Sequence, residues 1–492
     1  MLFFKNTTNL SELNSLFEGS NKGVERLCET LIQFMDSRRF RSSTGIKSKG
    51  YSFSELFQFL FLFPFLGKAS IYALSKCGIA GEVSAKKDAY YDLLNHPEIN
   101  WRNLLFSFAK QFRTKVNKGS QSGEQNKNTP SALIIDDTLL AKTGKQIEGV
   151  SLVHDHSDRT YKLGFKALVF SYFDGKNIIP LDFSLHSESH KPKREALKKL
   201  MKKLRSNMFV KKREAYSKGT IRKKELKVKK TDNTLLMLRR AIKHGFKAPY
   251  LLVDSWFVNA ELIKTVRSVA KKTMHLIGMV KQDKRKYEMD GKLYTAKAIA
   301  TKLMHKKQRN KRYKLDYIKV ACSYKNTPVT LYFVRVTNQS EWKALLTTNT
   351  TISFTQVFEI YQIRWSIEVM FRDCKQHLGL GVAQSNDFDA QIASVTLVLM
   401  RYITLALVLR FENYETIGEL FRQSSERLTG LTLMEKIWIA IKEFILSLAV
   451  LIGADWELLM KRLARSETET NQLFDIFRKI NNSQNNTVYG NT

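Results

Sequence analysis

Three acidic residues stand where carboxylates could act together on metal ions. Asp136 follows the apolar run ALII, Asp254 follows the apolar run YLLV, and Glu368 lies in a segment with helical periodicity. We expect both aspartates at the tips of buried strands, and paired strands lie only about 4.8 Å apart, so the two side chains can share ions. Carboxylate oxygens suit Mg²⁺, and two such ions can stabilise the attacking and leaving oxygens of a phosphodiester. The pattern indicates metal-dependent cleavage and transfer at phosphodiesters.

The segment that carries Glu368 is predicted to be one uninterrupted helix. Ser353 and Gln356 have the spacing of a capping box, and Gly379 and Gly381 supply a stop. No proline lies between the cap and the stop. At 100° per residue, Tyr361, Arg364, Glu368 and Lys375 fall within roughly 60° of one another.

The same helix has an apolar stripe beside this polar face. By the same reckoning the stripe spans roughly 100° and is typical of a side that packs on a core; its members are Ile360, Ile363, Ile367, Met370, Phe371, Cys374 and Leu378. A solvated face with spaced charges is the alternative interpretation of the polar row.

Charge composition indicates a polyanionic partner. Lys and Arg number 81 against 46 Asp and Glu, a formal net charge of +35 in 492 residues. Because phosphate contacts release counterions, nucleic acid is the leading partner and an anionic membrane surface the second. Residues 392–409 are nearly long and apolar enough to span a bilayer, but Arg401 lies at their centre. We interpret them as a buried core helix and expect no membrane partner.

The first residues of the chain and the spacing of its cysteines predict where the protein is located and how its thiols behave. The start MLFFKNTTNL lacks the basic residues and long apolar core of an export signal, so we expect a cytoplasmic protein. The cysteines are scattered and form no CxxC pair, at Cys28, Cys77, Cys322 and Cys374. Neither a disulfide framework nor a zinc site is indicated.

The N-terminal quarter of the chain has a different sequence pattern from the rest. Residues 1–117 contain a series of short helical patterns with basic flanks, which fits either a helical DNA-binding domain or a helical cap that only packs. Residues 118–130 are polar and lack aliphatic side chains, so we predict a linker.

The remainder predicts an α/β fold with a mixed sheet. Predicted strands and helices alternate in a first part, residues 131–281, and resume in a second part, residues 351–410, after a β-rich insertion at 282–350. Residues 411–475 are predicted to be helical, and 476–492 to be disordered.

A basic stretch lies inside the first part. Residues 191–230 hold 18 Lys or Arg against three acids. Charge that dense is not expected to pack on itself, so the stretch is either a mobile solvated insertion or a contact that follows a DNA backbone.

Three motifs together resemble a known family. They are DDT at 136–138, VDSW at 253–256 and the pattern Y-x2-R-x3-E-x6-K at Tyr361, Arg364, Glu368 and Lys375. These residues resemble the DDE transposases of bacterial insertion sequences, in the group defined by the YREK signature. The resemblance covers roughly residues 130–410 and implies an RNase H-like catalytic domain with a β-strand insertion, preceded by an all-helical N-terminal domain and followed by C-terminal helices.

The resemblance also implies roles for individual residues. Asp136, Asp254 and Glu368 match the catalytic triad that binds Mg²⁺, with Mn²⁺ as a substitute. The family's D-x-T spacing favours Asp136 as the ligand over the adjacent Asp137. Tyr361, Arg364 and Lys375 match the residues that hold phosphates of the transposon end, Arg by bidentate contact and Lys as a point charge.

Tryptophans near these motifs could stack on bases. Trp342 precedes LLTT much as a base-stacking tryptophan does in similar proteins, although a core or surface position is an alternative. Trp256 and Trp365 adjoin signature positions, but burial is the default expectation for both.

The implied function is a transposase at the bacterial nucleoid. A homodimer in a synaptic complex would bind terminal inverted repeats in double-stranded DNA, nick them with water activated by Mg²⁺, and join the freed 3′-hydroxyl to target DNA. One alternative is an RNase H-like nuclease without strand transfer, against which the YREK row and the basic stretch argue. Another is a non-catalytic DNA-binding protein derived from a transposase, against which the complete triad argues.

Overall fold

The computed structural model describes most of the chain between residues 22 and 426. The described ranges are 22–35, 40, 50–67, 71–72, 85–119, 129–155, 158–188, 195–269, 272–337, 341–412, 414–426 and 429. Several predictions therefore fall outside the described residues, either wholly or in large part; they concern residues 1–21 of the helical domain, most of the linker, most of the helical region 411–475, and the tail 476–492.

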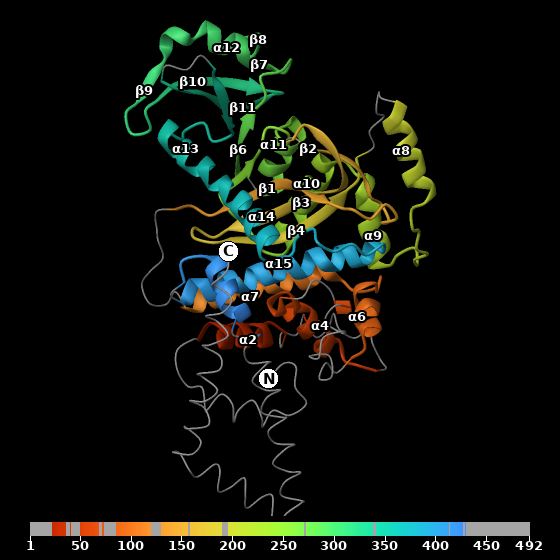
Figure 1. Ribbon diagram of the computed structural model, residues 1–492. Helices are drawn as coiled ribbons and strands as arrows, with labels where there is room; N and C mark the ends of the chain where they lie inside the picture. The colour runs from red at the N-terminus through yellow and green to blue at the C-terminus, as the bar shows by residue number, and fades with distance from the viewer. Residues whose placement is uncertain are drawn as a thin grey trace, which may run out of the picture. The chain divides into compact units, whose positions relative to one another are not determined.

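The centre of the fold is a mixed sheet that confirms the predicted α/β class (Figure 1). Its strands run in the order β4-β3-β1-β5-β6. β3 pairs antiparallel with β1 and β4, whereas β1, β5 and β6 are parallel, as in an RNase H-like domain. The strands span Ala132–Ala141 (β1), Thr160–Phe173 (β3), Ile178–His186 (β4), Tyr250–Val253 (β5) and His275–Val280 (β6).

The strands β1, β3 and β4 form an antiparallel meander, and the short strand β2, Ser151–Asp155, adds to it. The turn between β3 and β4 uses Asp174, whose Oδ1 accepts the N–H groups of Lys176 and Asn177, and Gly175 at φ 104°. The strand β2 is not in the predicted set and pairs with the first residues of β3.

Residues 282–350 are rich in strands, and they extend the same sheet. β12 pairs antiparallel with β6, and the order continues as β12-β11-β10-β7-β8, with β9 on β10. Lys325 and Asn326, both at positive φ, form the tight turn between β10 and β11. The elements are β7 Lys286–Met289, β8 Lys292–Thr295, α12 Ala296–Lys302, η4 Met304–Lys306, β9 Gln308–Asn310, β10 Leu315–Tyr324, β11 Thr327–Val336 and β12 Lys343–Thr347.

Helices from both ends of the described chain pack together beside the sheet (Figure 1). α7, Trp101–Gly119, contacts both β4 and α15, Phe388–Phe411. The elements α2 Lys22–Met35, α4 Phe53–Leu62, η1 Phe63–Leu66 and α6 Lys87–Leu94 belong to the same compact unit. The N-terminal helices are therefore built onto the catalytic sheet through α15.

The helix α15 is long and apolar enough to cross a bilayer, but 89% of its most apolar window is buried inside the protein. Arg401, at its centre, is also buried, and its guanidinium donates to the carbonyl oxygens of Leu60, Phe61 and Leu378. A cation bonded to carbonyls at the C-terminal end of α4 is favourably placed. This geometry fits the predicted core helix.

The basic stretch 191–230 corrects the expectation that its charge cannot pack. It forms α8 Glu195–Ser206, α9 Lys218–Lys224, η3 Glu225–Lys227 and the start of α10 Lys230–Lys243. Five of its cations form ion pairs with acids of β1, β4, η3, α15 or the loops beside them; they are Lys211, Arg213, Arg222, Lys223 and Lys230.

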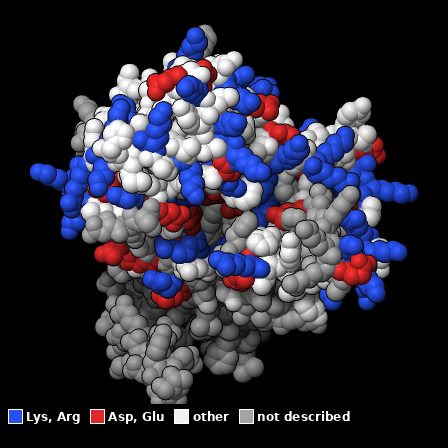
Figure 2. Space-filling model, turned by 90° about the horizontal axis from the view of Figure 1, so that it is seen from above, with Lys and Arg blue, Asp and Glu red and all other residues white. Residues whose placement is uncertain are grey.

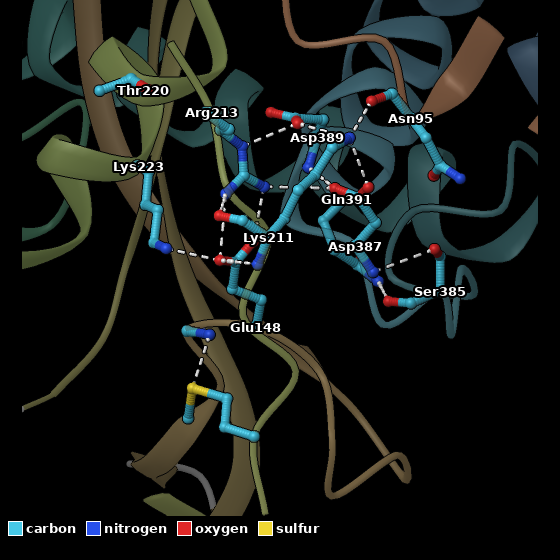
Figure 3. Close-up of polar contacts among 12 residues, drawn as sticks. Asn95, Glu148, Lys211, Arg213, Thr220, Lys223, Ser385, Asp387, Asp389 and Gln391 are labelled. Atoms are coloured by element: carbon cyan, nitrogen blue, oxygen red, sulfur yellow. Dashed lines mark hydrogen bonds and ion pairs between the residues drawn. The ribbon is translucent and has the colours of Figure 1, made fainter. Parts of the chain in front are cut away.

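Arg213 is the centre of this anchoring (Figure 3). Its guanidinium bonds to Glu148 at 2.5 Å, to Asp389 at 2.8 Å and to Asp387 at 3.3 Å. These four side chains are at most 9% exposed. The hydrogen bonds compensate the cost of burying charge, and without Arg213 the three carboxylates would share only Lys211 and Lys223 as cations.

We predict that Arg213→Ala lowers the free energy of unfolding by about 3 to 5 kcal/mol, because Glu148, Asp387 and Asp389 then stay buried with only Lys211 and Lys223 as counter-charge. Urea denaturation followed by circular dichroism measures the change. Arg205→Ala, at an exposed position of α8, is the control and should change stability by no more than about 0.5 kcal/mol. A loss below about 1 kcal/mol for Arg213→Ala would contradict the anchoring role.

His186, at the end of β4, is held as a neutral side chain. Its Nδ1–H donates to the carbonyl of Val228 at 3.0 Å, and Nε2 lies 2.7 Å from the hydroxyl of Ser184. Burial penalises the imidazolium and lowers the pKa of His186 from 6.5 to about 4. Folding therefore favours the neutral form.

The folded-state pKa of His186 lies below its unfolded value, so its contribution is complete above pH 6.5 and is lost as the pH falls toward 4. We predict that the wild-type protein loses about 3 kcal/mol more stability than His186→Gln between pH 7 and pH 4. Denaturation curves at several pH values give both slopes. Equal slopes would show that His186 does not titrate in this range.

Candidate active site

The sheet brings the two predicted aspartates together. β1 and β5 are parallel neighbours, and their ladder ends at the pair Ile135–Val253. Asp136 and Asp254 are the next residue on each strand, and the charge of Asp254 acts on the pKa of Asp136. The expected strand tip at Asp136 is wrong, because β1 continues to Ala141 along the longer strand β3. It is the pairing of β1 with β5 that ends there, directly before Asp136.

The helix of Glu368 is broken into three pieces instead of being continuous. The Ser353–Gln356 capping box opens α13, Phe354–Gln362, as predicted. A 3₁₀ turn, η5 Ile363–Trp365, then connects it to α14, Ser366–Gln376. A 3₁₀ turn winds more tightly than an α-helix, so the angular positions do not carry across it unchanged. Gly379 and Gly381, at φ 79° and 93°, follow the end of α14.

The apolar stripe packs as predicted with one exception. Ile363 lies in the 3₁₀ turn and is half-buried, whereas the other members of the stripe are buried. α14 packs against β1 and α13 packs against β6. This anchoring directs Glu368 and Arg364 to the end of the β1–β5 pairing.

Arg364 joins the carboxylates of two separate elements. Its Nη1 donates to Oδ2 of Asp136 at 2.6 Å, and its Nη2 donates to Oε1 of Glu368 at 2.6 Å. Tyr361, in the last turn of α13, is oriented by a hydrogen bond from its hydroxyl to the carbonyl of Val253 at 3.4 Å. The predicted row of residues therefore meets Asp136 and Asp254 at one place.

The electrostatics of this cluster show a shortage of positive charge. Burial raises the pKa of Asp136 to about 7, and the repulsion from Asp137 and Asp254 adds to it, although Arg364 opposes the shift. Burial also raises the pKa of Tyr361 to about 12. Burial disfavours the charged form of Arg364, but Tyr361, Asp136 and Glu368 outweigh it and raise the Arg364 pKa. One guanidinium does not fully compensate the buried carboxylates.

The adjacent aspartates have different partners. Asp137 accepts a hydrogen bond from Nζ of Lys230 at 2.5 Å and lies 3.7 Å from Nζ of Lys166. Asp136 instead faces Arg364 and Asp254. The geometry therefore favours Asp136 as the member of the carboxylate cluster, in agreement with the D-x-T spacing.

An open cleft of about 540 Å³ lies over the cluster. Asp136 and Glu368 line it, and Lys375, which is exposed in the last turn of α14, lines it as well. The remaining lining residues are Asp137, Thr138, Phe371, Arg372 and Gln376. The cleft thus offers three carboxylates and two cations to a ligand from solvent.

The chemistry of the donor set fits a divalent cation. Within the described residues, no group of three or more His, Cys, Asp or Glu side chains is placed to hold a metal ion. The guanidinium of Arg364 lies between Asp136 and Glu368. Carboxylate oxygens are the donors that a hard cation prefers, so these residues suit a divalent ion in their chemistry, with Arg364 in competition for the same oxygens.

The tryptophans lie in other positions than expected. Trp342 is only 8% exposed, and Arg335 stacks over its ring at 4.5 Å, so the structure places this candidate base-stacking residue in the core. Trp256 and Trp365 are 63% and 61% exposed, which corrects the expected burial of both. Nζ of Lys281 lies over the Trp256 ring. Trp256 lies two residues after Asp254, and Trp365 directly follows Arg364. This closeness to site residues was the sequence signal that both rings could be exposed near the site.

Comparison with known families gives a match over residues 65–344, to the model described as DDE superfamily endonuclease. The chain belongs to the DDE superfamily of endonucleases. The matched residues include Asp136 and Asp254 and end before the helix of Glu368. No curated protein matches the chain.

Membership of the DDE superfamily gives the protein a DNA substrate and a nuclease or transposase type of activity. Endonucleases of this superfamily generally use divalent metal ions. The carboxylate cluster that the fold assembles is chemically suited to that requirement.

Proposed function

We propose that this DDE endonuclease is a transposase of the YREK group that moves a bacterial insertion sequence by a cut-and-paste route. The observation that carries the proposal is the contact of Arg364 with Asp136 and Glu368, beside Asp254. It joins the signature helix to the two strands that bear the aspartates. All the polar signature residues except Lys375 thereby interact with one another directly or through charge.

In this proposal Asp136, Asp254 and Glu368 hold Mg²⁺, with Mn²⁺ as a substitute. When bound, such ions lower the pKa of water and stabilise the attacking and leaving oxygens of a phosphodiester. The half-buried position of Asp136 supports the assignment, because burial raises its pKa despite the charge of Arg364, and a bound cation would stabilise the ionised form. The protein supplies the carboxylates on two paired strands and on a helix that packs against β1.

Tyr361, Arg364 and Lys375 are proposed to hold the phosphates of the DNA end. Lys375 lines the cleft and is exposed, so it can meet a phosphate without rearrangement. Arg364 uses Nη1 and Nη2 on carboxylates, so a phosphate must compete with Asp136 and Glu368 for it. A DNA phosphate that attracts Arg364 would release carboxylate oxygens at the same time.

The DNA partners in this proposal are transposon ends and target DNA, bound by a homodimer in a synaptic complex. The charge of +35 supports binding to DNA, and Lys and Arg cover much of the face in Figure 2, with smaller groups of Asp and Glu between them. The same cluster would serve a nuclease without strand transfer. An assay on a supercoiled plasmid with candidate ends distinguishes a transposase from such a nuclease, since only a transposase joins the excised 3′-hydroxyl to other DNA.

We predict that Asp136→Asn lowers metal-dependent nicking of such a plasmid by roughly a thousandfold or more, because a carboxylate ligand is lost. Asp137→Asn is the matched control at the next position and should cost no more than about tenfold, since Asp137 pairs with Lys230 and Lys166. Gel analysis of nicked and linear products with Mg²⁺ or Mn²⁺ measures both. The reverse order of effects would assign the ligand to Asp137.

We further predict that Arg364→Ala tightens Mn²⁺ binding in the absence of DNA by roughly tenfold, because the competing guanidinium is gone. Isothermal titration with Mn²⁺ measures the affinity. Lys375→Ala removes a cation of the same cleft that has no bond to the carboxylates, and it should change the affinity less. Weaker Mn²⁺ binding by Arg364→Ala would contradict the competition.

A further inference from the structure

The basic stretch 191–230 divides into an anchored half and a presented half. The anchored half carries Lys211, Arg213 and Lys223, whose charges are bonded to Glu148 and the acids at the start of α15 (Figure 3). The presented half is α8, whose sequence EALKKLMKKLRS has one acid against five bases. The ion pairs of the first half fix the chain that leaves α8.

The helix α8 uses its apolar side within the protein. Met201 and Leu204 are buried and pack against Leu152 of β2, together with Leu163 of β3. At 100° per residue, the cations lie on the opposite side of the helix within roughly 160°; they are Lys198, Lys199, Lys202, Lys203 and Arg205, and all are exposed. The packing therefore turns a broad cationic face to solvent.

The position of α8 relates this face to the catalytic cleft. α8 packs at Leu152, and β2 ends at Asp155, three residues or about 10 Å further along the strand. The charges of Asp155, Lys162 and Lys166 act on Lys375, which lines the cleft. Asp155 thus lies between α8 and the cleft, and a duplex that leaves the cleft over Lys375 passes along these three residues of β2 in about three base-pair steps, at 3.4 Å each.

We propose that the cationic face of α8 binds the sugar–phosphate backbone of duplex DNA that continues out of the catalytic cleft. The direction of the duplex rests on the proposed function, because the cleft must hold the scissile end. Lysines four apart on α8 are separated by about 6 Å along the helix, and phosphates of one strand recur at about 3.4 Å of duplex axis, so several contacts form at once.

A membrane surface is the less suitable polyanion for α8. Helices that lie on a bilayer insert an apolar face beneath the headgroups. Met201 and Leu204 are already buried against the strands β2 and β3. The contact is electrostatic and follows the backbone, so it should depend strongly on salt and little on base sequence.

The test compares two variants of equal charge. In the first, Lys198, Lys199, Lys202 and Lys203 of α8 are changed to Gln. In the matched control, four exposed lysines in the segment from the start of β8 to the residue before β9 are changed to Gln, at Lys292, Lys297, Lys306 and Lys307. Fluorescence anisotropy with a labelled duplex of about 30 base pairs measures affinity between about 50 and 200 mM NaCl, without divalent metal.

The α8 variant should lower the slope of log K against log salt by about 3 to 4, since each neutralised phosphate contributes about 0.9. The control variant should keep the wild-type slope. An unchanged slope for the α8 variant, or equal losses in both variants, would overturn the proposal. A larger loss on vesicles containing phosphatidylserine than on DNA would overturn it in favour of a membrane surface.

A second measurement locates the contact. Lys202→Cys labelled with a thiol-reactive photo-crosslinker should attach to the duplex, and Lys297→Cys treated in the same way should not. Efficient cross-linking at residue 297 alone would overturn the proposal. The binding measurements do not depend on cleavage. A protein that failed to nick DNA would therefore contradict the proposed function, while the role of α8 in DNA binding could still be tested.

Discussion

The bond of one guanidinium to two carboxylates is the interaction on which the candidate site depends. Asp136 comes from a central strand and Glu368 from a helix more than 200 residues later, and Arg364 bonds to both. Without a cation between them, these two carboxylates would repel each other. The protein thus carries its own counter-ion between them, and under the proposed function a metal ion would have to displace Arg364 from their oxygens.

Backbone pairing sets the distance over which that guanidinium has to act. The parallel ladder of β1 and β5 ends at Ile135–Val253, so Asp136 and Asp254 emerge side by side. β1 itself continues, held by β3, and Asp137 on the next position is bonded to Lys230. Alternation along the strand therefore separates two adjacent aspartates into different environments. A slip of one residue in this register would exchange them.

The sequence predicted the structural features that neighbouring residues determine. It did not predict the features that depend on residues far away in the chain. Apolar runs before Asp136 and Asp254 predicted two buried strands, which the structure pairs, and the capping box predicted the start of α13. The 3₁₀ turn at 363–365 was missed, since it has no Gly or Pro to mark it. The end of β1 depends on the length of β3, and the anchoring of 191–230 depends on acids such as Glu148 elsewhere in the chain. The residues of β1 do not reveal the length of β3, and residues 191–230 do not reveal which acids they bind.

The continuity of the sheet through β12 has a mechanical consequence. β12 is hydrogen-bonded to β6, and Thr348 extends the link, since its N–H donates to the carbonyl of Leu276 and its hydroxyl accepts the N–H of Leu276. Residues 348–353 then lead directly into α13. A load applied to the β-rich insertion is carried by this ladder into the strand beside β5 and into the helix that precedes Arg364.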